Sequence, residues 1–137
     1  PIKRAGLTPA QIKRRRRELP FFLADLLVVH LAAFFHVRLA TACGYGADDE
    51  APPIEALLSK RPGTLPPWCH RDLALLAEVR NSIVHGNGRV SSNNPRLLAA
   101  GWTAAALSAE SSLPERSFGH FLRFKRAVRT AGNVLSL

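Results

Sequence analysis

The sequence has no methionine and a single tyrosine, and its two cysteines, Cys43 and Cys69, lie outside any CxxC spacing. Two isolated cysteines exclude a disulfide framework and a cysteine-based zinc site, so we expect free, buried thiols in a reducing compartment. Residues typical of strands are sparse, and Val and Thr do not alternate with polar residues. Alanine and leucine dominate instead, which favours helices. A length of 137 residues fits a single domain, so we expect one helical domain, 1–137.

Acidic residues are also few. Ten Asp and Glu stand against 19 Lys and Arg, and the formal net charge is +9. A domain this basic favours a polyanionic partner, either nucleic acid or an acidic protein surface. Most of the basic residues are arginine, whose planar fork binds two phosphate oxygens at once. The composition therefore favours RNA or another nucleic acid as partner.

No secretory signal is visible, because the first 18 residues hold basic runs without a short apolar region that ends in small residues. Four arginines followed by about twenty mostly apolar residues, 21–42, do resemble a membrane anchor. Asp25, His30, His36 and Arg38 argue against insertion, since an Asp near the centre of a membrane helix costs about 2.5–3.5 kcal/mol. We expect a cytoplasmic protein that makes no membrane contact and buries this segment on most faces, within a dimer core.

Apolar periodicity and capping signals predict an all-α, up-and-down bundle of four to five helices that forms a dimer. Thr8-Pro9 and Asn94-Pro95 each begin a helix, with an N-cap side chain followed by proline in the first turn. Pro20 marks either one long helix or two that meet at a kink. The predicted helices cover 9 to Gly44, 53–60, 67–85, 95 to about 112 and 114 onward.

The last predicted helix is amphipathic. The apolar residues that we expect to face inward are Phe118, Phe121, Leu122, Val128 and Leu135. Its opposite face is basic, and this face, the four-arginine run and one loop arginine are expected to bind RNA phosphates. These residues are Arg14, Arg15, Arg16, Arg17, Arg89, Arg123, Lys125, Arg126 and Arg129.

Residues 78–88 read EVRNSIVHGNG at the end of an apolar helix. Taken alone, Arg80 fits a solvated helix charge and Asn81 a residue near a cap. His85 fits a cation in the last turn, with Gly86 as the left-handed cap. The three polar residues together, at this spacing, favour a functional site.

The segment Arg80-Asn81-Ser82-Ile83-Val84-His85 resembles the signature of the HEPN superfamily, closely over 73–89 and loosely over the helical plan. The resemblance implies a helical bundle that dimerises and, for many members, a metal-independent ribonuclease. Such members serve as bacterial toxins, defence effectors or RNA-processing factors, and other members are inactive nucleotide- or partner-binding domains. A protein antitoxin is a further partner that the resemblance implies.

One position departs from the family. In a toxin group that is controlled by modification, a tyrosine stands two residues after the histidine. Asn87 occupies that position here, and Tyr45 is the only tyrosine. Control by that route is therefore not expected.

RNA cleavage without a metal needs a base for the 2′-hydroxyl, a cation for the developing charge and an acid for the leaving oxygen. Of the motif residues, His85 alone exchanges a proton near neutral pH, while the fork of Arg80 suits a phosphoryl group. Asn81 can orient the phosphate or the imidazole. Glu78, one turn earlier on the same face, and Asp25, from a neighbouring helix, are the expected supporting residues. No ligand spacing supports a metal and no glycine-rich loop supports a cofactor, so we expect neither.

Helix geometry separates two ways of building this site. Residues five apart lie about 140° apart around a straight helix, so Arg80 and His85 point in different directions. Either the helix frays at its end, or two copies of the motif face each other across a twofold axis. We favour the composite site, because it supplies one histidine for each proton transfer.

Overall fold

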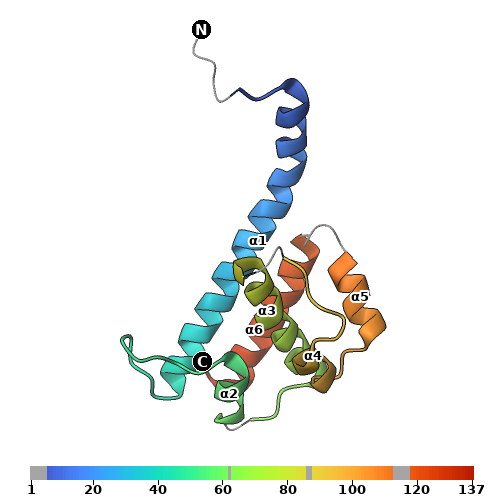
Figure 1. Ribbon diagram of the computed structural model, residues 1–137. Coiled ribbons are helices and arrows are strands. Elements are labelled where there is room, and N and C mark those ends of the chain that lie inside the picture. The colour runs from blue at the N-terminus through green and yellow to red at the C-terminus, as the bar shows by residue number, and fades with distance from the viewer. Residues whose placement is uncertain (1–5, 62, 86–87, 113–117) are drawn as a thin grey trace.

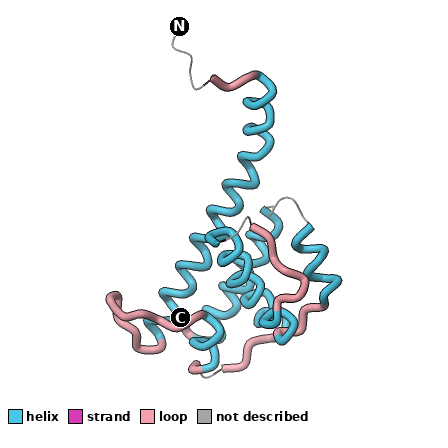
Figure 2. Tube along the Cα trace, viewed as in Figure 1, coloured by secondary structure: helices cyan, strands magenta, loops and turns pink. Residues whose placement is uncertain are grey.

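The computed structural model describes residues 6–61, 63–85, 88–112 and 118–137, apart from the side chains of Pro20, Phe21, Ser111 and Ser112. These residues form helices joined by loops, with no strand in the described ranges (Figure 2). The predicted all-α class is confirmed. The helices are α1 (Pro9–Ala42), α2 (Ile54–Ser59), α3 (Pro67–His85), α4 (Pro95–Ala99), α5 (Ala104–Ser112) and α6 (Phe118–Leu135).

Helix α1 begins at the predicted cap. Thr8 Oγ1 accepts a hydrogen bond from Gln11 N at 3.2 Å, and Thr8 N donates to Gln11 Oε1 at 2.9 Å, which completes a capping box. The helix is continuous through residue 20, so the single-helix alternative is the observed one. Figure 1 shows its N-terminal half standing clear of the other helices, and its first buried residue is Ala24.

The core lies between α1, α3 and α6, each of which packs against the other two. Helices α3 and α6 are antiparallel, because Asp72 contacts Arg123 while Cys69, one turn earlier, donates to Ala127 O. The shorter helices cover this core, each burying one leucine completely. The largest fully buried side chains are Phe35, Leu39, Leu57, Leu73, Leu75, Leu76, Leu97, Leu107 and Phe124.

The predicted helix over 95–112 is wrong, because the chain turns between α4 and α5. Gly101 has a φ of +94°, a left-handed conformation that glycine adopts without strain. The turn allows Trp102 Nε1 to donate to Arg71 O at 3.2 Å. Thr103 Oγ1 then accepts from Ala106 N at 3.1 Å and starts α5.

The orientation of α6 is partly as predicted. Val128 and Leu135 are buried and Phe121 is half-buried against the core. Phe118 and Leu122 are 45% and 59% exposed, so the inward placement of these two is wrong. The predicted start of this helix at Pro114 lies outside the described residues.

The expected burial of 21–42 on most faces, within a dimer core, is not reached within one chain and stays a prediction for the dimer. One stripe of α1 is buried, because only that side faces α3 and α6; it consists of Ala24, Val28, Ala32, Phe35 and Leu39. On the other side Phe22 is 60% exposed and Val37 63%. By length and composition α1 is able to cross a membrane, and a quarter of its most apolar window is buried.

Candidate functional site

Arg80 and Asn81 lie together on α3 and are both half-buried. Arg80 Nη1 donates to Asn81 Oδ1 at 3.0 Å, so the amide holds one edge of the guanidinium. Both residues line a cavity of about 450 Å³. The preceding turn of α3 contributes Glu78, and the other walls come from α1, from residues 50–55 and from α4; they include Ala33, His36, Val37, Glu50, Glu55 and Arg96.

His36 is a cavity residue that the motif did not identify. Its Nε2 lies 2.7 Å from Pro52 O, and because a carbonyl only accepts, this nitrogen carries a proton. In the neutral ring Nδ1 is then the basic nitrogen. The only signal in the sequence was a polar residue in an apolar helix, because His36 and Arg80 meet through the packing of α1 on α3.

Glu78 binds two residues at the start of α4. Its Oε2 accepts from Asn94 Nδ2 at 2.8 Å, and its Oε1 lies 3.5 Å from Arg96 Nη1. Asn94 Oδ1 accepts from the backbone N–H groups of Arg96 and Leu97, which confirms Asn94 as the predicted N-cap. Glu78 therefore fixes α4 and Arg96 beside the cavity.

His85 is the last residue of α3 and is exposed. The helix is regular up to this residue, so the fraying alternative is not observed. The described lining of the Arg80 cavity does not include His85. Asn81 and His85, four residues apart, do share a helix face. The composite arrangement across two copies stays a prediction.

The chain that returns from α3 is held beside the helix end. Ser82 Oγ donates to Arg89 O at 2.6 Å, and Gly88 N donates to Ser82 O at 3.1 Å. Gly88 has a φ of +68°, which this close return requires. Arg89 is exposed, with its backbone held at Ser82. The predicted cap, Gly86, lies outside the described residues, as does Asn87.

Asp25 was expected to approach the motif from a neighbouring helix. It is half-buried on α1, and α1 packs directly against α3. The described residues that line the Arg80 cavity do not include Asp25. Asp25 therefore does not reach Arg80 through this cavity, and its supporting role stays a prediction.

The predicted phosphate-binding residues fall in two regions. Arg14 to Arg17 are all exposed on the free half of α1. At 100° per residue around the axis of α1, Arg17 and Arg14 lie about 20° and 40° from Val28, whose side chain is buried. Both therefore lie on the side of α1 that packs against α3 further along the helix. Arg14 Nε lies 2.8 Å from Glu18 Oε1, but this ion pair is exposed and contributes little to stability.

The second basic region is the outer face of α6, where Lys125, Arg126 and Arg129 are exposed as predicted. The guanidinium of Arg126 lies 4.5 Å from the centre of the Trp68 ring, a cation–π contact at the start of α3. Trp68 and His85 are about 25 Å apart along the helix. The basic region on α6 therefore lies at the end of α3 away from His85.

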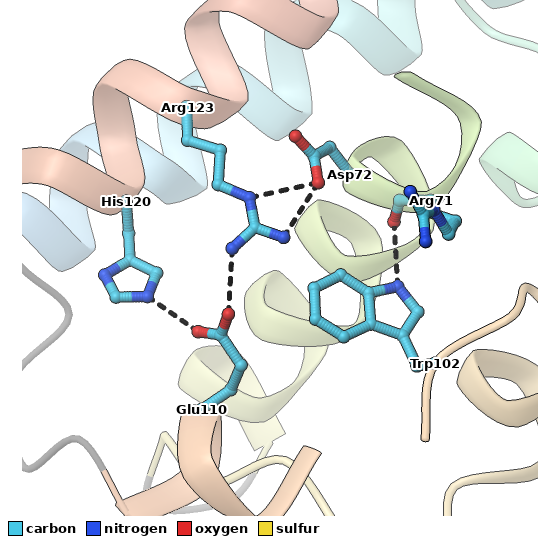
Figure 3. Close-up of polar contacts among 6 residues, drawn as sticks. All are labelled: Arg71, Asp72, Trp102, Glu110, His120 and Arg123. Carbon is cyan, nitrogen blue, oxygen red and sulfur yellow. Dashed lines mark hydrogen bonds and ion pairs between the residues drawn. The ribbon is translucent and has the colours of Figure 1, made fainter. Parts of the chain in front are cut away.

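The placement of Arg123 on this exposed face is wrong. Arg123 is half-buried and bonds to two carboxylates, as Figure 3 shows. Its Nε and Nη2 donate to Asp72 Oδ1 at 3.0 and 2.8 Å, and its Nη1 donates to Glu110 Oε1 at 2.8 Å. Its guanidinium also lies 5.0 Å from the centre of the Trp102 ring. Arg123 thus joins α3, α5 and α6, and its donors are directed into the protein.

His120 completes this ion-pair cluster, with Nε2 2.6 Å from Glu110 Oε2. The hydrogen bond with His120 lowers the pKa of Glu110, burial opposes that shift, and Arg123 reinforces it. For Arg123, burial lowers the pKa, but the bonds to Asp72 and Glu110 outweigh it and leave the pKa raised. Both shifts favour the charged forms of Glu110 and Arg123, and the ion pair between them joins α5 to α6.

No protein-family model, curated protein or solved structure matches this chain. In the part of the chain that the structure describes, no three His, Cys, Asp or Glu side chains are grouped as metal ligands. The cavity brings Arg80 and Asn81 of α3 together with His36 of α1, and His85 lies at the end of α3.

Proposed function

We propose that this chain is a metal-independent endoribonuclease of the HEPN type, which acts as a homodimer in a bacterial toxin or defence system. The observation that carries the proposal is the Arg80–Asn81 pair at a cavity wall, with His85 exposed on the same helix face as Asn81. A basic chain with two exposed clusters of arginine and lysine supplies the attraction for RNA.

The proposed reaction uses the 2′-hydroxyl of the RNA as the nucleophile. One neutral imidazole takes the 2′-hydroxyl proton, the 2′-oxygen bonds to phosphorus, and the bond from phosphorus to the 5′-oxygen breaks. A protonated imidazole then gives its proton to the departing 5′-oxygen. The products are a 2′,3′-cyclic phosphate and a 5′-hydroxyl, with no other reactant consumed. His85 from each of two copies supplies one of the two imidazoles.

Arg80 has the role of the cation in this scheme. A guanidinium has five N–H donors, and the contact with Asn81 uses one of them. The remaining donors can bind the non-bridging phosphate oxygens, whose charge grows in the transition state. Asn81 sets the direction of the fork and so acts as a positioning residue.

A second candidate function is a non-catalytic domain that binds a nucleotide, RNA or a protein partner. The cavity favours it, because about 450 Å³ is within the range of small-ligand sites. Its wall includes Arg80, Arg96, Asn81 and His36, which suit a phosphate and a base edge. The carboxylates Glu50, Glu55 and Glu78 also line it, and Glu78 is paired with Arg96. His85 lies outside that wall.

Cleavage of a dye-labelled RNA in the presence of EDTA separates the two functions. We expect the wild-type chain to cut, and His85→Ala and Arg80→Ala to abolish cutting while circular dichroism and native mass stay unchanged. His70→Ala is the matched control, because His70 is exposed on the first turns of the same helix. Cleavage that survives both substitutions refutes the site. A wild-type chain that binds a nucleotide through Arg80 but does not cut supports the second function.

A further inference from the structure

The outer side of α1 carries a regular stripe of exposed residues. Its members are spaced alternately four and three residues apart, and they are Leu19, Leu23, Leu26, His30, Ala33 and Val37. This alternation is the seam pattern of a coiled coil, in which each side chain inserts between four residues of a facing helix. Every member of the stripe is exposed within one chain. The stripe therefore has the spacing of a helix-packing surface without a helix on it.

Large apolar side chains widen this surface on both sides. Phe22 flanks the stripe on one edge, while Leu27 and Phe34 flank it on the other, and all three are exposed. The opposite side of α1, from Ala24 to Leu39, is already buried against the core. Continuous apolar surface of this extent on a folded domain marks an interaction site.

We propose that the outer stripe of α1 packs against the same stripe of a second copy of this chain, with the two helices antiparallel. A second copy supplies the complementary seam spacing, because a twofold axis pairs one surface with itself. The stripe spans about 27 Å from Leu19 to Val37 at 1.5 Å per residue, which is longer than two heptads.

The charge distribution selects the antiparallel arrangement. In a parallel pair, the basic runs Lys13–Arg17 of both copies lie side by side and repel. In an antiparallel pair, each run lies at the C-terminal end of the other α1, where the helix dipole is negative. The exposed acidic residues Asp48, Asp49 and Glu50 follow that end, in the loop that projects beside it in Figure 1.

One register satisfies both the seam and the charges. It places Leu26 against His30 of the second copy on either side of the axis. The next pairs outward are Leu23 with Ala33 and Leu19 with Val37, so each large side chain meets a smaller one. In this register the basic run 13–17 lies level with residues 39–43 of the second copy, directly before the acidic loop.

The interface would adjoin the candidate site. Ala33 and Val37 belong both to the stripe and to the wall of the cavity that holds Arg80 and Asn81. A second α1 on the stripe therefore runs along the rim of that cavity and brings its own basic run toward it. The outer stripe lies on the side of α1 opposite the one that packs against α3, so this interface does not itself bring the two His85 side chains together. It does not depend on RNA cleavage, and each proposal can fail without the other.

Light scattering of the full chain during gel filtration, at micromolar concentration, tests the interface. We expect a mass of two 15.0 kDa chains. Leu26→Lys should give the monomer with unchanged helical content. Leu122→Lys, at a leucine on α6 that lies outside the stripe and is 59% exposed against 41% for Leu26, should stay dimeric. A monomeric wild-type chain, or a dimer indifferent to Leu26→Lys, overturns the proposal.

Crosslinking tests the direction of the two helices. In a Cys43→Ser background, the double variant Leu19→Cys and Val37→Cys should form an intermolecular disulfide, while Leu19→Cys alone should not. A disulfide from Leu19→Cys alone indicates parallel helices and refutes the register. Flotation with vesicles of phosphatidylcholine and phosphatidylserine tests the membrane alternative, and a chain that floats with them as a monomer contradicts the proposal. A dimer that does not cut RNA refutes only the nuclease. A monomer that cuts refutes this interface together with the composite site of two His85 side chains, but not the nuclease itself.

Discussion

Arg123 on α6 holds Asp72 on α3 through two hydrogen bonds to one carboxylate oxygen, at 3.0 and 2.8 Å. Asp72 is the one charged residue in the buried class among those described, so its charge depends on this partner. The same guanidinium bonds to Glu110 and thereby connects α5 to the core. This relationship explains why an arginine within a basic face is withdrawn from solvent.

Removal of Arg123 should destabilise the fold. Arg123→Ala leaves Asp72 buried without its charge partner, a change that costs about 1.5–3 kcal/mol for a hydrogen bond to a charged group. Since Arg123 is itself partly exposed, we expect the lower half of that range. Urea unfolding followed by circular dichroism measures it, with Arg129→Ala at an exposed position of the same helix as the control. Equal stability of the two variants would contradict the structural role of Arg123.

Stability should fall in acid through Glu110. Its pKa is lowered in the folded state by the hydrogen bond with His120 and by Arg123, against an ordinary value of 4.5. A lowered pKa contributes stability above pH 4.5, and that contribution is lost as the pH falls through the folded-state value. Glu110→Gln should therefore be less stable than the wild type at pH 6 and approach it near pH 3. A constant difference in unfolding free energy across this range would exclude Glu110 as the cause.

The two thiols should differ in reactivity. Burial, together with the charge of Asp72, raises the pKa of Cys69 to about 11. Cys69 is fully buried and its Sγ donates to Ala127 O at 3.2 Å. We expect Cys43, which is half-buried, to react first with a thiol reagent at pH 8, and Cys69 to react only in denaturant. Comparison of Cys43→Ser with the wild type assigns the fast thiol, and fast labelling of Cys43→Ser would contradict the burial of Cys69.

Local signals in the sequence predicted the parts of the fold that depend on neighbouring residues. Thr8-Pro9 and Asn94-Pro95 predicted both caps, because a cap is made within one turn. The break at Gly101 was missed, since it depends on the contact of Trp102 with Arg71, thirty-one residues earlier. Periodicity within a segment does not report contacts of that separation.

The candidate site was predictable to the same limited degree. The motif placed Arg80 and Asn81 on one helix, and their mutual contact follows from adjacency. The approach of His36 from α1 required the packing of two helices. Likewise, α1 is apolar on two sides, and the sequence pattern did not distinguish the side that packs within the chain from the side that is exposed.

RNA binding should depend strongly on salt through the free half of α1. Replacing Arg14, Arg15, Arg16 and Arg17 with glutamine removes four cations from the N-terminal part of α1, where the side chains of residues 11–19 are all exposed. For single-stranded RNA, the slope of log affinity against log salt should shrink by as much as about 2.8, at about 0.7 per phosphate contact. Fluorescence anisotropy at about 50 to 200 mM salt, a range over which such slopes are measured, gives the slope for each variant.

The matched control for this experiment is Arg71→Gln, an exposed arginine at the start of α3, away from the α1 arm. We expect its slope to equal that of the wild type, because a change in net charge alone acts weakly beyond a Debye length of about 10 Å. If four substitutions on α1 leave the slope unchanged while Lys125→Gln and Arg129→Gln reduce it, RNA lies along α6. The basic run Arg14 to Arg17 would then contribute to the dimer and not to RNA binding, with its positive charge near the acidic loop of the second copy.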